Sequence, residues 1–192
     1  MITVEPINLN LKSVNLSDEQ FYQLCHNNDD WRIEQTAAGE LIIMPPIAAI
    51  SGNRESDLNG FVWLWNRQTK LGKVFSYSTI FTLPKGGKCS PDVAWIANER
   101  WDALPREEQE KFATICPDFV IELRSHTDSL TQLQAKMQEY LDSGLRLGWL
   151  IDPISQQVAI YRQNQEVEII SLPTTLSGED VLPGFTLELP IF

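Results

Sequence analysis

The segment from residue 119 to residue 151 constrains the fold more than any other part of this 192-residue chain. Residues 119–124 form a strongly apolar run typical of a strand, and residues 145–151 form a second, nearly continuous one. Between them, residues 129–141 carry apolar side chains at steps of three and four, which predicts a helix ending near Gly144. A strand, a helix and a strand in this order predict two parallel strands joined by a helical crossover.

Periodicity and turn residues predict the remaining elements. Residues 31–35 and 40–44 flank a turn at Gly39 and predict an N-terminal β-hairpin. The other predictions are helices over 17–26 and 51–70, a meander of short strands at 73–77, 79–83 and 92–96, an irregular or helical stretch over 98–113, a hairpin of 158–162 and 167–172, and an irregular tail over 173–192.

These elements predict an α/β fold with a mixed β-sheet flanked by helices. The chain has no internal repeat and no low-complexity linker. We therefore expect a single domain over residues 1–192, with a core of about 30–172 and short terminal extensions.

Composition excludes several classes of protein. No apolar stretch of membrane-spanning length and no basic-then-apolar leader is present, so we expect a cytoplasmic protein without a membrane segment. The three cysteines, Cys25, Cys89 and Cys116, are widely separated, and the only histidines are His26 and His126. This spacing argues against a disulfide framework and against a structural zinc site.

The net charge of −11 disfavours contact with a phosphate polyanion, but the charge is unevenly distributed. Residues 51–100 hold seven basic against four acidic side chains and form the one basic block. The block is either a solvated helix face with a loop or a rim that faces phosphates. Its cations are Arg54, Arg67, Lys70, Lys73, Lys85, Lys88 and Arg100.

Two carboxylates stand out because they lie on or beside apolar strands, where a buried charge is costly. Asp92 follows Ser-Pro at the start of one predicted strand, and Glu122 lies inside another. Strand alternation places Glu122 and Arg124 on one face. One reading is structural: Glu122 forms an ion pair with Arg124 or a nearby lysine, and Asp92 is a turn or capping residue. In the other reading, both carboxylates hold a hard divalent cation such as Mg²⁺, and Lys136 on the next helix orients a water molecule.

Four motifs resemble a known family. They are ELIIMPP at 40–46, SPDVA at 90–94, PDFVIELRS at 117–125, and KMQEYLDSG at 136–144, which continues into WLIDP at 149–153. With these motifs the chain resembles the PD-(D/E)XK nuclease superfamily and, within it, the Uma-two-type family of restriction-endonuclease-like proteins. The resemblance extends from about residue 17 to residue 185.

The resemblance implies a restriction-endonuclease-like core and a magnesium-dependent phosphodiesterase site, with Mn²⁺ as an alternative ion. Asp92 and Glu122 match the acidic metal ligands of the motif, and the backbone carbonyl of Leu123 would contribute. Glu55 resembles an extra acidic residue that some members carry on their first core helix; a solvated glutamate at a helix start is the alternative.

Arg124 departs from the motif, because it stands where the family pattern has lysine. An arginine clamps phosphate but does not readily give up a proton, so Lys136 is the candidate replacement, and a surface lysine is the alternative reading. We read Ser125, Thr127 and Asp128 as caps of the following helix.

The resulting hypothesis is a DNA endonuclease, with DNA as partner and a homodimer as the expected assembly. Two alternatives stay open. One is an inactive module of the same fold that binds nucleic acid or another protein, and the other is a metal-free protein whose strand carboxylates form buried salt bridges.

Overall fold

A six-stranded mixed sheet forms the centre of the computed structural model, which describes residues 5–14 and 16–190. Its strand order is β11-β10-β9-β8-β7-β4, and β8 and β9 are its one parallel pair among the described residues. The strands are β4 (Gly72–Ser76), β7 (Val93–Ala97), β8 (Phe119–Leu123), β9 (Leu147–Asp152), β10 (Gln157–Arg162) and β11 (Glu168–Ser171).

The predicted parallel crossover is confirmed. Helix α5 (Leu130–Asp142) joins β8 to β9 and packs on the sheet between them. Its N-cap is Ser129, whose hydroxyl accepts from the backbone N–H of Gln132, so the predicted caps at Ser125, Thr127 and Asp128 are wrong. Those three residues form the preceding turn, in which Asp128 accepts from the backbone N–H of Ser125 at 2.7 Å.

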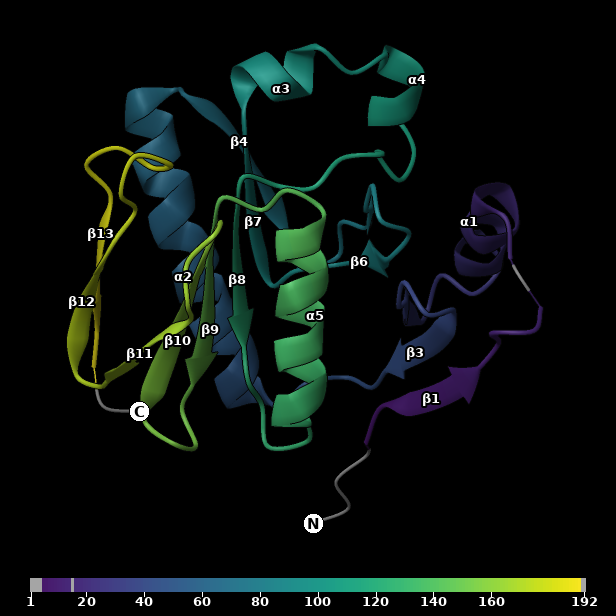
Figure 1. The fold of residues 1–192 in the computed structure, drawn as a ribbon, viewed down its shortest axis with the longest axis horizontal. Coiled ribbons are helices and arrows are strands. Elements are labelled where there is room, and N and C mark those ends of the chain that lie inside the picture. Colours follow the sequence, from purple (N-terminus) through teal and green to yellow (C-terminus); the bar gives the residue numbers. More distant parts are fainter. Residues whose placement is uncertain (1–4, 15, 191–192) are drawn as a thin grey trace.

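The two faces of this sheet carry different helices, because neighbouring side chains of a strand point to opposite faces. Figure 1 shows α5 in front of the sheet and α2 (Ala49–Thr69) behind it. On the α2 face, Trp95, Ile121 and Trp149 pack against Trp65 of the helix and its neighbours. On the α5 face, the next residues along the strands pack against Met137 and Tyr140, which are fully buried.

A second sheet, of order β1-β3-β2-β6-β5, lies beside α5. The predicted hairpin is confirmed as β2 paired with β3. The predicted meander is wrong, because β4 and β7 pair in the central sheet while β5 and β6 pair here. The strands are β1 (Ile7–Asn10), β2 (Arg32–Gln35), β3 (Glu40–Met44), β5 (Phe81–Thr82) and β6 (Lys88–Cys89), and α1 (Asp18–His26) precedes β2.

The C-terminal segment is ordered, contrary to the expectation of an irregular tail. Strands β12 (Thr174–Ser177) and β13 (Thr186–Leu189) form an antiparallel pair that buries Leu176 and Leu187 in the core beside α2. The stretch after β7 contains two short helices, α3 (Asn98–Asp102) and α4 (Arg106–Gln109). Across the described residues, no helix has the length and apolar character needed to cross a bilayer.

Gly72 offers a test of the close approach between β4 and β7, with Gly60 of α2 as the control. A Cβ at Gly72 would lie 2.2 Å from the carbonyl oxygen of Ile96 and 2.5 Å from the Trp95 ring, whereas a Cβ at Gly60 meets nothing within 4 Å. We expect Gly72→Ala to lower the free energy of unfolding by about 1–3 kcal/mol through overpacking. Gly60→Ala, on an exposed helical position, should raise it by about 0.5–1 kcal/mol. Urea denaturation of both variants checks this, and equal stability of the two would contradict the close approach at Gly72.

Candidate active site

Strand register brings Asp92 and Glu122 together. Strands β7 and β8 pair with Val93 opposite Ile121, so Asp92, one residue earlier, lies across from Glu122, one residue later. The regular strand pairing ends there. The next backbone N–H of β8, that of Leu123, donates instead to the Asp92 carboxylate, at 2.8 Å from its Oδ2. Both carboxylates are buried and lie on the α5 face of the sheet.

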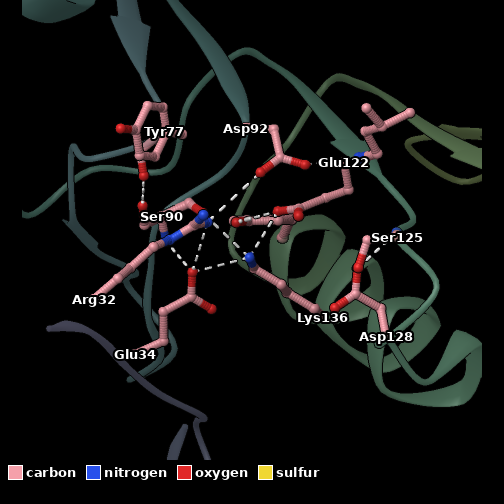
Figure 2. A network of polar contacts seen from close by, with 11 residues as sticks. Arg32, Glu34, Tyr77, Ser90, Asp92, Glu122, Ser125, Asp128 and Lys136 are labelled. Carbon is pink, nitrogen blue, oxygen red and sulfur yellow. Dashed lines mark hydrogen bonds and ion pairs between the residues drawn. The ribbon is translucent and has the colours of Figure 1, made fainter. Parts of the chain in front are cut away.

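Lys136 of α5 reaches Glu122, one of these two carboxylates. Its Nζ lies 2.9 Å from Glu122 Oε1 and 3.1 Å from Glu34 Oε1, and it donates to the carbonyl oxygen of Ser90 at 3.3 Å. Figure 2 shows the amine between the two glutamates. The hydroxyl of Tyr140, one helical turn further on, donates to Glu122 Oε1 at 2.9 Å. Lys136, with 11% of its side chain exposed, is thus a largely buried partner of Glu122 and not a surface lysine.

Strand β2 supplies two residues that the sequence analysis missed. Arg32 Nη2 lies 3.3 Å from Glu34 Oε1 and 3.7 Å from Asp92 Oδ1, and it donates to the carbonyl of Ser90. Glu34 Oε1 also accepts from the backbone N–H of Ser90 at 3.1 Å. The apolar strand that singled out Glu122 has no counterpart at Glu34, whose strand reads Arg-Ile-Glu-Gln, so the one available signal was an acid two residues from a cation.

Arg124 lies at the same sheet edge but outside this cluster. Its Nη1 lies 2.8 Å from Asp152 Oδ2 at the end of β9, and its Nε donates to the carbonyl of Asp128 at 3.4 Å. Of the two ion-pair partners considered for Glu122, Arg124 is therefore wrong, because Asp152 on the neighbouring strand binds that guanidinium, and a nearby lysine, Lys136, forms the pair.

Glu55 lies near the cluster without joining its ion pairs. It is buried on the side of α2 that faces the sheet, and Asp92 and Arg32 are among its electrostatic neighbours. Among the described residues, no ion pair within 4.0 Å involves the Glu55 carboxylate. Burial, with Asp92 adding to it, raises the pKa of Glu55 to about 7.

Burial also sets the protonation of the other groups. It raises the pKa of Glu122 and of Asp92, although Lys136 opposes the effect on Glu122 and Arg32 opposes that on Asp92. Burial alone would lower the pKa of Lys136, but Glu122 and Glu34 raise it above its ordinary value. Lys136 is therefore held as an ammonium, and a nearby cation would favour the ionised form of both carboxylates.

A cavity of about 260 Å³ adjoins the cluster, between the β2–β3 hairpin and α5. Glu34 and Lys136 lie on its wall, so the cluster opens to this cavity. Its other acidic lining residues are Glu40, Asp128 and Glu139.

The basic block of residues 51–100 is only partly a surface rim. Lys88 is buried: its Nζ lies 3.0 Å from Asp18 Oδ1 and donates to Gln35 at 3.1 Å. Arg100 is 2.9 Å from the fully buried Asp118. The prediction of a phosphate-facing rim is therefore wrong for Lys88, and Arg100 serves a structural ion pair.

Comparison with known proteins assigns the chain to a family. A family model described as "Uma2: Putative restriction endonuclease" matches residues 18–190. The chain belongs to the Uma2 family. The Uma2 chain is also similar to the crystal structure of a putative nuclease belonging to DUF820 from Anabaena variabilis ATCC 29413. The two are 25% identical with a TM-score of 0.68, over 83% of this chain and 87% of that chain. No curated protein matches it.

The donors at this Uma2 site, carboxylate and carbonyl oxygens, are of the type that a magnesium ion prefers. Asp92 and Glu122 are carboxylates on adjoining strand ends, and the Leu123 carbonyl lies next to Glu122 in the chain. Within residues 5–14 and 16–190, no group of three or more His, Cys, Asp or Glu side chains could hold a metal ion. One or two carboxylates, with water and substrate phosphate completing the shell, are how Mg²⁺ is usually bound.

Removing the ammonium of Lys136 should destabilise the folded protein, because two buried carboxylates would lose their cationic partner. We expect Lys136→Met to lower the free energy of unfolding at pH 8 by about 3–5 kcal/mol, because Glu34 and Glu122 lose their ammonium partner. At pH 5 the loss should be smaller, since the raised pKa of Glu122 lets a proton replace the ammonium. Denaturation at both pH values measures this. The control is Lys73→Met, an exposed position of β4, and a loss independent of pH would contradict the argument.

Glu55→Gln should stabilise the protein at high pH. The pKa of Glu55 in the folded protein, about 7, lies above the ordinary value of 4.5. The folded state therefore holds this proton more tightly, and ionisation of Glu55 costs stability as the pH rises from about 5 through 7. We expect the gain from the substitution to grow by about 1–2 kcal/mol between pH 5 and pH 8. Thermal unfolding against pH checks this, with the exposed Glu188→Gln as a control that should show no such growth.

Proposed function

We propose that this Uma2 protein is a metal-dependent endonuclease that hydrolyses phosphodiester bonds of DNA through a PD-(D/E)XK-type site in a restriction-endonuclease-like core. The observation that carries the proposal is the convergence of Asp92, Glu122 and Lys136 at one sheet edge. Membership of the Uma2 family supports it.

The residues divide the chemistry among them. Asp92 and Glu122, with the Leu123 carbonyl, would hold Mg²⁺ or Mn²⁺, which when bound supplies positive charge at the phosphate and acidifies a bound water. Lys136 would orient the attacking water and offset the charge that develops on the phosphate. Its ammonium lies 2.9 Å from Glu122 and is therefore next to a proposed metal ligand.

Two further residues have supporting roles in this proposal. Glu34 is a positioning residue, because it binds Lys136, Arg32 and the backbone of Ser90 at once and so fixes Lys136 relative to the Ser90–Asp92 turn. Arg124 would contact a nonbridging phosphate oxygen. Asp152 binds Nη1 of this guanidinium. Because an arginine side chain has five N–H donors, others can still donate to a phosphate.

A non-cleaving module that binds nucleic acid or protein is the second candidate, and one observation favours it. Each carboxylate already has a cationic neighbour, Lys136 at 2.9 Å for Glu122 and Arg32 at 3.7 Å for Asp92. Such pairs can balance buried charge without a metal.

Cleavage assays separate the two candidates. We expect the wild type to cleave plasmid, single-stranded or structured DNA in Mg²⁺ or Mn²⁺. Asp92→Asn and Glu122→Gln should each lower the rate by about a hundredfold or more, because each removes a metal-binding charge. Glu188→Gln, an exposed residue of β13, removes the same charge elsewhere and should cleave like the wild type. Equal cleavage by all four proteins would identify a contaminant and overturn the proposal.

Calorimetric titration with Mg²⁺ tests the same residues without DNA. Binding by the wild type and Glu188→Gln, but not by Glu122→Gln, is the expected result. If the wild type binds DNA with a steep salt dependence yet neither binds metal nor cleaves, the non-cleaving module is the better assignment.

A further inference from the structure

Tyr77 is an exposed aromatic side chain at the edge of the candidate active site. It directly follows β4, in a turn where the backbone N–H of Thr79 donates to the carbonyl of Ser76 at 3.0 Å and the hydroxyls of Ser76 and Ser78 lie 3.1 Å apart. Tyr77 is 49% exposed, so the hydrophobic core uses little of its ring. The site therefore borders on an aromatic surface that faces solvent.

Two contacts connect Tyr77 to the site, and both can be followed in Figure 2. The hydroxyl of the fully buried Ser90 donates to the backbone carbonyl of Tyr77. The guanidinium of Arg32 lies over the Tyr77 ring, with Cζ 5.8 Å from the ring centroid, and its Nη2 is 3.7 Å from Asp92 Oδ1. Ser90 is two residues from Asp92, a span of at most about 7 Å. Tyr77 is thus held close to a proposed metal ligand.

The chain segment that contains Tyr77 carries no acidic side chain. Residues 58–91 include five Lys or Arg but no Asp or Glu, although the protein has 26 acidic residues. The cavity between the hairpin and α5 is instead lined by acids, among them Asp128, and Figure 2 shows Asp128 and Tyr77 on opposite sides of the cluster. A phosphate backbone therefore meets less repulsion when it approaches the site from the Tyr77 side.

An aromatic ring at this place can recognise DNA only through an unpaired base. In a duplex the neighbouring bases cover both faces of each base, so a protein ring stacks on a base that is single-stranded or flipped out. Arg32 packs against the Tyr77 ring, and about half of the residue remains open for such a base. The turn and the Ser90 contact hold the Tyr77 backbone in place beforehand, which lowers the entropy cost of stacking.

We propose that Tyr77 stacks on an unpaired base beside the scissile phosphate, and that the substrate class of this site is single-stranded DNA or an unpaired segment of a duplex. Arg32 is a positioning residue in this arrangement, because it packs on the ring and pairs with Asp92. The inference rests on the proposed function, since it names the form of DNA that the site would cleave.

A short single-stranded oligonucleotide that carries the fluorescent base 2-aminopurine tests the stacking. It is titrated with protein in Ca²⁺, and binding is read from its anisotropy and stacking from the quenching of its fluorescence. We expect Tyr77→Ala to weaken binding by about tenfold or more and to remove the quenching, because the stacking surface is lost. Tyr77→Phe keeps the ring and should bind and quench like the wild type.

Trp63→Ala is the matched control. Trp63 is 52% exposed and also packs against an arginine, with Arg67 Cζ 5.4 Å from its ring, but it lies on α2 and outside the site. This variant should bind the single strand like the wild type. A blunt duplex of the same sequence should bind more weakly than the single strand, and with equal affinity to the wild type and all three variants.

The possible outcomes separate this inference from the proposed nuclease. If Tyr77→Ala weakens binding as expected but no protein cleaves DNA in Mg²⁺ or Mn²⁺, the nuclease is wrong and the stacking site stands. If the wild type cleaves DNA yet binds the single strand no better than Tyr77→Ala does, or no better than it binds the duplex, the stacking is rejected. A wild type that binds neither form of DNA also rejects it. In an active enzyme, Tyr77→Ala should raise KM more than it lowers kcat, since Tyr77 would bind beside the reacting phosphate.

Discussion

The buried charge cluster between β7, β8, β2 and α5 is the interaction on which the site depends. Three carboxylates, Glu34, Asp92 and Glu122, share two cations, Arg32 and Lys136. All three carboxylates are buried, so with every acid ionised the cluster would hold one more negative than positive charge in a region of low dielectric. Burial is the largest cause of the raised pKa of Asp92 and Glu122, and repulsion from the neighbouring carboxylates adds to it. A divalent cation is the kind of ligand that such a cluster would stabilise.

The crossover helix connects this cluster to the core. Met137 and Tyr140 fill the space above the sheet, and Lys136, next to Met137 in the chain, is directed to the sheet edge instead. Tyr140 belongs to both the core and the charge cluster, because its ring packs in the core while its hydroxyl donates a hydrogen bond to Glu122. Disturbing the packing of α5 would therefore also move the ammonium of Lys136. Stability and the geometry of the site rest on the same helix.

Sequence patterns predicted those features that depend on local order. The parallel crossover and the β2–β3 hairpin follow from periodicity and a glycine turn, and strand alternation already placed Glu122 away from the Ile121 face. The contacts of Glu34 were beyond this reasoning, because Ser90 is 56 residues away and Lys136 is 102 residues away. Strands β12 and β13 were missed for a related reason: each has only four residues, and their partner surface on α2 is distant in the sequence.

The surplus of negative charge also bears on how an acidic protein could approach DNA. The chain has a net charge of −11, and the cavity beside the cluster is lined by further acids, including Glu40, Asp128 and Glu139. A phosphate brought near Glu122 without a cation would meet repulsion from several carboxylates in a partly desolvated region. If the protein acts on DNA, metal binding must therefore favour DNA binding, and by reciprocity DNA must tighten the metal. In this arrangement the acidic cluster would discriminate against DNA binding at the site until a divalent ion has neutralised it.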